Sequence, residues 1–170
     1  IGVEEEYVLV DVETRAVAND PPPALFSALH DRTAGRAFPE FLRSQVEVAT
    51  PVCRTISEVR TSLTELRRAV VEESARFGLA PIASASHSFS LSSRQQRTDK
   101  ERYVALLEEM QGVARRMMIC GMHVHVGIDV DELRIDLMNQ ARYFLPHLLT
   151  LSTSSPFAEG EDTGLKCYRL

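Results

Sequence analysis

Apolar residues recur along the chain with two different periods, and the period changes from one segment to the next. A spacing of two residues is typical of a strand with one buried face, and a spacing of three or four is typical of an amphipathic helix. We predict strands at residues 2–11, 44–50, 80–86 and 118–129. We predict helices at residues 24–30, 55–77, 100–117 and 130–143, the last of them interrupted or restarted at Pro146. Strands and helices that take turns in one chain indicate a mixed α and β fold.

The predicted helix at residues 55–77 has the clearest boundaries. It opens with a capping-box pattern, Thr55-Ile-Ser-Glu58, in which side chains satisfy free backbone groups of the first turn. Apolar residues then recur at helical spacing, at Val59, Leu63, Leu66 and Val70. Gly78 follows the segment, and glycine is typical of the position just after a helix.

Composition and charge narrow the class of protein. A hydrophobic content of 44% with 25% charged residues is ordinary for a soluble globular chain. The net charge of −5 argues against a nucleic-acid partner, which needs a basic surface. We also expect no membrane segment, because the sequence lacks the run of about 18 apolar residues that a spanning helix needs. A secretory signal pattern is not visible either.

Length, cysteines and chain ends add three expectations. A chain of 170 residues has the length of one domain. The three cysteines are Cys53, Cys120 and Cys167. An odd number of cysteines at wide spacing suits free thiols in the cytoplasm better than a disulfide framework. The chain opens inside a strand pattern and stops at Leu170 without a helix stop or a polar tail. We therefore expect residues 1–170 to be one domain, incomplete at its C-terminus, of a longer protein.

The first predicted strand carries acids in an otherwise apolar run. Because strand side chains alternate, Glu4 and Glu6 share one face, while Glu5 and Tyr7 share the other. Two carboxylates about 7 Å apart on one face repel each other unless a cation lies between them. Glu47 repeats the pattern in the middle of the second predicted strand. The acids therefore either mark a solvated strand end or hold a cation.

The last predicted strand carries two histidines on one face. His123 and His125 alternate with Met122, Val124 and Val126, so the two sets point to opposite sides. We expect the apolar set to be buried against helices and the histidines to face an open, polar concavity. A lone histidine on such a face is more often structural. Two of them, flanked by glycines that leave room for a ligand, favour a binding site.

The acids and the histidine form a candidate metal site. Glu4, Glu6, Glu47 and His123 would supply hard oxygen ligands and one imidazole. This mixture suits Mg²⁺ or Mn²⁺ better than a closed zinc site, which prefers thiolates or more imidazoles. We predict that the four side chains converge on one metal site.

Several motifs together resemble a known family. The strand GMHVHVG resembles the GMHxH strand of glutamine synthetases. The whole set resembles the carboxylate–amine ligase branch, or type 2 family, of the glutamate–cysteine ligases. Its members, in chain order, are GVEEEY, VEVATPVC, GLAPIASASH, CGMHVHVGI and LPHLLTLSTSSPFAEGEDTG. Because the order and spacing of these motifs agree from residue 1 to residue 170, the resemblance is far more specific than one pair of histidines.

The resemblance implies a fold and an activity. The fold is glutamine-synthetase-like α+β: a curved antiparallel sheet with helices on one face and an open active-site funnel on the other. Residues 1–170 would be the N-terminal part of the catalytic domain. The activity is ATP-dependent amide-bond formation between a carboxylate such as that of glutamate and an amine, through an acyl phosphate and with Mg-ATP. Small-molecule substrates are the implied partners, and a homo-oligomer is compatible with the family.

The resemblance also implies roles for individual residues. Glu4, Glu6, Glu47 and His123 would be metal ligands, and His125 would contact the nucleotide phosphates. Arg169 would be a catalytic cation for the substrate carboxylate or the migrating phosphoryl group, since guanidinium geometry suits either task. The alternative for Arg169 is an ordinary surface arginine.

Two other functions remain open from the sequence. The chain could be a metal-dependent hydrolase that uses its histidines and carboxylates to activate water. A surplus of glutamates and the absence of a third well-placed histidine count against this reading. It could also be an inactive or regulatory fragment that keeps the fold. Among the remaining histidines, His30 and His147 are expected to be structural, while His87 could either close a strand or reach the funnel.

Overall fold

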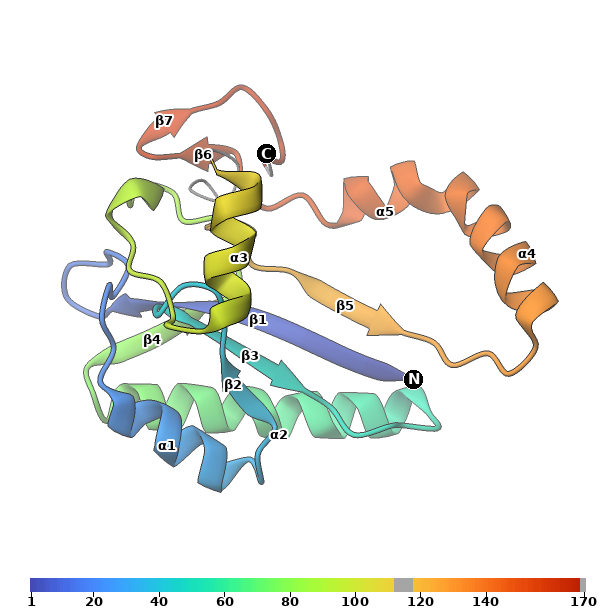
Figure 1. Cartoon of the computed structure of the whole chain (residues 1–170), viewed down its shortest axis with the longest axis horizontal. Coiled ribbons are helices and arrows are strands. Elements are labelled where there is room, and N and C mark those ends of the chain that lie inside the picture. Colours follow the sequence, from blue (N-terminus) through green and yellow to red (C-terminus); the bar gives the residue numbers. More distant parts are fainter. Residues whose placement is uncertain (112–117, 169–170) are drawn as a thin grey trace.

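A five-stranded antiparallel sheet forms the centre of the molecule (Figure 1). The computed structural model describes residues 1–111 and 118–168, without the side chains of residues 102, 104, 106 and 107. The strands of the sheet are β1 (Gly2–Asp11), β2 (Ala37–Pro39), β3 (Gln45–Ala49), β4 (Leu79–Ile82) and β5 (Met122–His125). The central strand, β1, pairs with β3 along one edge, and β2 extends the sheet beyond β3. Along its other edge β1 pairs with β5 near its start and with β4 near its end.

Helices cover one face of the sheet. The longer helices are α1 (Pro23–Arg32), α2 (Ile56–Ala75), α3 (Glu101–Met110), α4 (Asp131–Ala141) and α5 (Leu145–Leu151). Two of them, α1 and α2, lie side by side against one face, which we call the helix face. The main core forms there from Tyr7, Leu9, Leu25, Leu29, Val46, Val48, Leu66 and Val70, all buried. None of the described helices is both long and apolar enough to span a membrane.

A smaller core lies on the opposite face, under α3. Val8 of β1 is buried there with Phe41 and Tyr103, whose rings meet edge to face with centroids 5.3 Å apart. This core covers only the end of β1 that carries Val8, so the end that carries Glu4 stays open. The expected mixture of helices with an antiparallel sheet is confirmed. The helix on the second face was not expected.

The element boundaries follow the sequence pattern with some differences. In α2, the Thr55 side chain accepts a hydrogen bond from the Glu58 backbone N–H at 3.2 Å, as the capping pattern predicts. The last two predicted strands are shorter in the structure, because β4 ends at Ile82 and β5 covers only residues 122–125. Just beyond β4, the Ser84 hydroxyl donates to the Ser86 carbonyl, and such local bonds compete with strand pairing. Residues 112–117 of the predicted third long helix lie outside the described residues.

Short elements were not predicted. The edge strand β2 has only three residues, and β6 (Phe157–Ala158) and β7 (Glu161–Asp162) form a separate two-residue hairpin within a predicted loop. A 3-10 turn, η1 (Ser92–Arg94), lies in another predicted loop, and a second, η3 (Arg142–Phe144), joins α4 to α5. Elements this short have too few residues to show a period.

The prediction that one face of β5 is buried was wrong. Met122, Val124 and Val126 are 62%, 58% and 62% exposed. Their alternation with the histidines is present, but no helix in the described part of the chain lies over that side of β5. The α4–α5 segment leads away from the sheet instead of folding back onto it (Figure 1).

An ion pair between buried Glu5 and the more exposed Arg67 fixes α2 to β1. Glu5 lies on the helix face and is buried, and its carboxylate accepts hydrogen bonds from Arg67 of α2, at 2.8 Å from Nε, and from the Tyr7 hydroxyl. Burial alone would raise the pKa of Glu5, but the bonds from Arg67 and Tyr7 outweigh it and hold that pKa below its usual value. Burial and the neighbouring Glu5 raise the pKa of Tyr7, which keeps its hydroxyl a donor.

Replacing Arg67 by methionine should destabilise the fold. The change leaves the buried carboxylate of Glu5 without its charged partner, and an unsatisfied buried acceptor costs about 1–3 kcal/mol. Urea denaturation should show a loss of this size for Arg67→Met. Arg68→Met is the matched control, because exposed Arg68 makes no ion pair with the described residues. Equal effects of the two substitutions would contradict the structural role of the Glu5–Arg67 pair.

Candidate functional site

The open half of the second sheet face carries the predicted metal-ligating residues. Strand register brings them together: Glu6 lies opposite Glu47 of β3, and Glu4 lies opposite His123 of β5. Residues directly opposite each other on paired strands share a face. Glu4, Glu6, Glu47 and His123 therefore occupy one continuous area, which we call the carboxylate face. His125 lies next to it, opposite Gly2.

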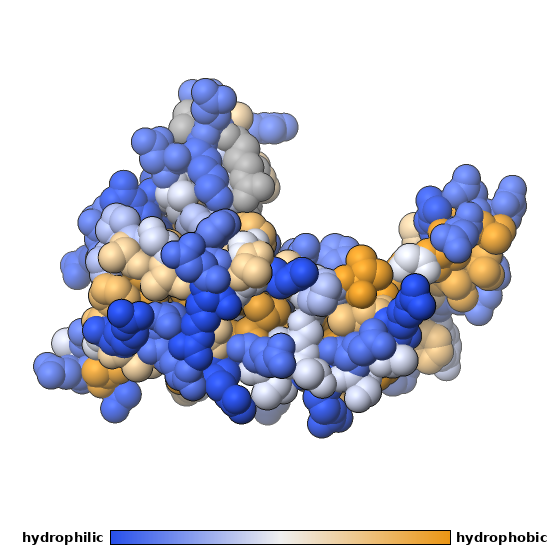
Figure 2. All heavy atoms as spheres, turned by 90° about the horizontal axis from the view of Figure 1, so that it is seen from below, coloured by the Kyte–Doolittle hydropathy of each residue, from blue (hydrophilic) through white to orange (hydrophobic). Residues whose placement is uncertain are grey.

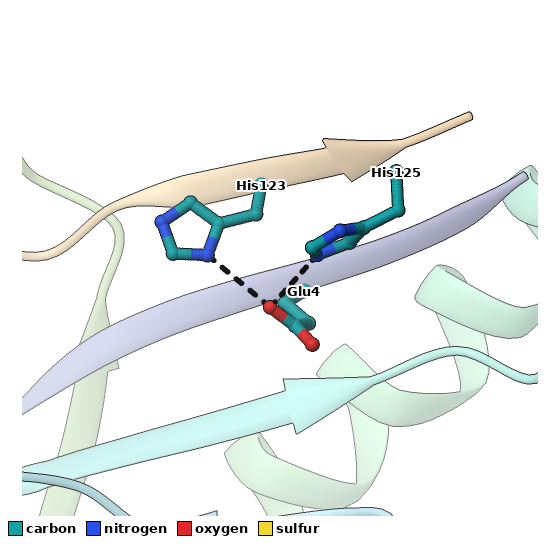
Figure 3. A group of neighbouring side chains, drawn as sticks. All are labelled: Glu4, His123 and His125. Carbon is teal, nitrogen blue, oxygen red and sulfur yellow. Dashed lines mark hydrogen bonds and ion pairs between the residues drawn. The ribbon is translucent and has the colours of Figure 1, made fainter. Parts of the chain in front are cut away.

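Two imidazoles converge on one carboxylate at the edge of this face (Figure 3). His123 Nδ1 lies 3.2 Å and His125 Nε2 lies 3.0 Å from the same Glu4 oxygen, Oε2. Hydrogen bonds from His125 and His123 lower the pKa of Glu4. One potential ligand atom from each residue falls within 4.8 Å of the others, so the three side chains could hold a metal ion. Both histidines are 59% exposed at their side chains, so the group is accessible to solvent.

Glu6 is held by the backbone of Gly121, the residue just before β5. Its Oε2 accepts a hydrogen bond from the Gly121 N–H at 2.9 Å, and its own N–H donates to the Gly121 carbonyl at 3.1 Å. A Cβ at Gly121 would lie 3.6 Å from His123 Nε2 and 3.8 Å from Glu6 Oε1. Glycine at this position thus leaves the space between Glu6 and His123 free.

Glu47 lies in a crowded acidic environment. Burial raises the pKa of its carboxyl group, and the neighbouring carboxylates of Glu40, Glu4 and Glu6 raise it further. Neither Arg nor Lys forms an ion pair with Glu4, Glu6 or Glu47 in the described part of the chain. A cleft of about 460 Å³ adjoins Glu47, and its lining residues are Phe38, Pro39, Glu40, Glu47 and Lys100.

Glu40 was missed by the sequence analysis. It follows β2, in a segment with no strand pattern long enough to place its side chain. Its carboxylate accepts a hydrogen bond from the Tyr103 hydroxyl at 3.2 Å, across 63 residues of sequence. The pairing of β2 with β3 places Glu40 near Glu47, because Phe38 lies opposite Glu47 and the Glu40 N–H donates to the Gln45 carbonyl at 3.3 Å. A strand of three residues is too short to show a pattern in the sequence.

The other histidines and the C-terminal loop lie apart from this group. His87 is buried and structural: its Nδ1 accepts from the Ser90 N–H at 3.0 Å, and its Nε2 lies 3.0 Å from the Arg15 carbonyl. It does not reach the carboxylate face. Asp162 caps its own turn by accepting from the Gly164 N–H at 3.0 Å. Arg169, the predicted catalytic cation, lies outside the described residues.

Comparison with known proteins decides the family. Residues 1–170 match the family model described as Glutamate-cysteine ligase family 2(GCS2). The chain belongs to this family. A relative from Rhodospirillum rubrum, provisionally named glutamate–cysteine ligase 2, is 54% identical over 174 residues, which cover 100% of this chain and 45% of the relative. A relative from Jannaschia with the same provisional name is 51% identical, again over 100% of this chain and 45% of the relative. The chain thus spans less than half the length of these curated relatives.

Solved structures share the fold at low sequence identity. A bifunctional glutathione synthetase from Pasteurella multocida superposes with a TM-score of 0.66 at 17% identity, over 91% of this chain and 23% of that one. A glutamate–cysteine ligase from Francisella tularensis, crystallised with AMP, gives a TM-score of 0.59 at 18% identity, over 82% and 29% of the two chains. The sheet and helices of this chain therefore have the architecture of ligases of this kind.

Replacing Glu47 by glutamine should stabilise the protein at neutral pH. Folding raises the pKa of the Glu47 carboxyl group above 4.5. The folded protein therefore loses stability as the pH rises from 4.5 through that raised pKa. Glutamine removes that loss, so the melting temperature of Glu47→Gln should exceed that of the wild type at pH 7.5, and the difference should shrink as the pH approaches about 4.5.

The matched control is Glu13→Gln. Glu13 is exposed and lies just beyond the end of β1 that is remote from the carboxylate face. Scanning fluorimetry in buffers free of divalent cations suits the measurement. A Glu47→Gln protein that melts below the wild type at pH 7.5 would contradict the electrostatic account of this face.

Proposed function

We propose that this chain carries the metal- and nucleotide-binding half of an ATP-dependent carboxylate–amine ligase of the glutamate–cysteine ligase type. The reaction would join a carboxylate, such as that of glutamate, to an amine through an acyl phosphate. The chain belongs to a glutamate–cysteine ligase family, and one structural neighbour was crystallised with AMP. The single observation that carries the proposal is the strand register that gathers three carboxylates and an imidazole on one open face.

The donor set fits Mg²⁺ or Mn²⁺. Glu4, Glu6, Glu47 and His123 would hold the metal, since carboxylate oxygens are the ligands that these ions prefer. The raised pKa of Glu47 agrees with this assignment: burial is its largest cause, the carboxylates of Glu40, Glu4 and Glu6 raise it further, and a bound cation would favour the ionised form against both. A bound ion would supply neutralisation of charge on the nucleotide phosphates.

Other residues would position the substrates. His125 stands beside the carboxylate face with its side chain more than half exposed, so its ring could donate a hydrogen bond to a phosphate oxygen once it turns from Glu4. We assign Arg169 to the substrate carboxylate or the migrating phosphoryl group. In phosphoryl transfer, positioning and charge neutralisation of this kind supply most of the catalysis.

A metal-dependent hydrolase is the second candidate. The Glu4–His123–His125 group favours it, because two imidazoles and one carboxylate are a common set for metals that activate water. Glu6 and Glu47 extend the donor set with oxygens beyond what such a site needs, and family membership favours the ligase. Three cysteines outside any disulfide agree with the cytoplasmic location proposed for either activity.

The test replaces ligands in a protein of full family length. This chain would be exchanged for the matched segment of the Rhodospirillum rubrum relative, and release of ADP and phosphate would be measured with MgATP, glutamate and a panel of amines. Glu4→Gln and Glu47→Gln should each lower turnover more than about 100-fold, because a metal ligand acts on charge that develops in the transition state.

Glu13→Gln should leave turnover unchanged and serves as the control. Amine-dependent release of phosphate would separate the ligase from the hydrolase, since a hydrolase needs neither ATP nor an amine. Full turnover in Glu4→Gln would remove the metal assignment.

A further inference from the structure

An apolar arm extends from the sheet without covering any part of it. The arm consists of α4, η3 and α5, residues 131–151, and is joined to β5 by residues 126–130. Every residue from 129 to 154 is exposed. The large apolar residues exposed on it are Leu133, Ile135, Leu137, Met138, Tyr143, Phe144, Leu145, Leu148, Leu149 and Leu151. Figure 2 shows the arm as a lobe that stands out from the body, with apolar side chains gathered on it.

The distribution of these side chains argues against a free surface helix. Leu133 and Ile135 are two positions apart, so they lie on nearly opposite sides of α4, and both are about half exposed, at 45% and 54%. Glu132, Asp136 and Asn139 give α4 one polar side, but its apolar residues spread over about half of its circumference, and an apolar stripe of that width normally packs against other protein. Monomeric proteins rarely expose contiguous apolar patches beyond about 300–600 Å², and larger patches mark interaction surfaces.

The exposed face of β5 continues the same surface. Met122, Val124 and Val126 are apolar and exposed, and the chain runs from them into the arm through residues 127–130. Within the described residues β5 pairs with β1 alone, so its outer edge is free to accept a strand. An unpaired edge with apolar side chains is a template for another strand. We call β5 and the arm together the docking surface.

We infer that the docking surface is covered, in chains of full family length, by the part of the same polypeptide that these 170 residues do not match. The relatives provide the occupant: at 54% and 51% identity over this whole chain, each has more than half of its length outside the match. The occupant would add a strand to the free edge of β5 and an apolar layer against α4 and α5. This inference rests on family membership and on exposure, and not on the proposed ligase activity.

Docking would also shape the carboxylate face. His123 and His125 lie on β5, so a strand added at its edge would run beside both imidazoles. Their 59% exposure would fall, and groups of the added strand would border the site. Groups in a water-poor site interact more strongly with charge, so the covered site would be better suited to bind phosphates.

The experiment compares two formats of the same substitutions. Leu137→Glu and Leu148→Glu would be made in the 170-residue chain and in the chimaera that carries this chain within the Rhodospirillum rubrum relative. Glutamate is a good helix former, so both variants should melt within about 1 °C of the parent in the short chain. In the chimaera each should lower the melting temperature by at least about 5 °C, because a charge would then be buried without a partner.

Val71→Glu in α2 is the matched control, since Val71 is also an apolar helix residue and is 52% exposed. It should give the same small shift in both formats. Light scattering on the short chain tests whether a second copy covers the surface instead. If the short chain forms a dimer that Leu137→Glu dissociates, and Leu137→Glu leaves the melting temperature of the chimaera unchanged, the occupant is a second copy and the inference is overturned. The inference is also overturned if the arm substitutions leave the melting temperature unchanged in both formats. A chimaera that fails to fold while the unmodified relative folds would overturn it as well.

Discussion

The alternation of side chains along β1 is the constraint on which the rest of the structure depends. Its odd positions, including Glu5, Tyr7 and Leu9, face α1 and α2, and its even positions, including Glu4 and Glu6, face the open side. A shift of one residue in the pairing would bury the two even acids under the helices and expose the core. The Glu5–Arg67 pair works against such a shift, because it ties one odd position to α2 through a charge-assisted hydrogen bond. The fold and the site are thus set by the same strand register.

The carboxylate face stores electrostatic repulsion. Glu6 and Glu47 lie directly opposite each other on adjacent strands, and like charges so placed are destabilising. The protein relieves this only in part. Backbone N–H groups and imidazoles hold Glu6 and Glu4, while the pKa of Glu47 stays raised. The cation that we propose for this face would offset that cost, whereas Glu5 on the helix face is already neutralised by Arg67.

Much of this arrangement could be predicted from the sequence, because strand periodicity is local information. The alternation alone placed Glu4 and Glu6 together, separated them from Glu5, and put His123 and His125 on one side of β5. The family resemblance, now established, supplied the antiparallel sheet with helices packed against it, but not the order of its strands. The burial prediction that was wrong, and the contacts that were missed, depend on elements or partners that a local sequence pattern does not show. Burial of Met122 and Val124 requires a covering layer that no residue near β5 can indicate. The approach of Glu40 to Glu47 depends on β2, a strand too short to show a period, and the contact of His87 with the Arg15 carbonyl spans 72 residues. Arg169 lies outside the described residues, so its role remains a prediction.

The central claim is that the carboxylate face is a metal site, and anomalous X-ray scattering tests it most directly. Crystals of the chimaera grown with Mn²⁺ and ATP would be measured above and below the manganese absorption edge. The account predicts an anomalous peak within about 2.0–2.4 Å of oxygens from Glu4, Glu6 or Glu47 and of a nitrogen of His123, the usual span of such bonds. A manganese peak elsewhere on the protein, with this face free of metal in the presence of nucleotide, would contradict it.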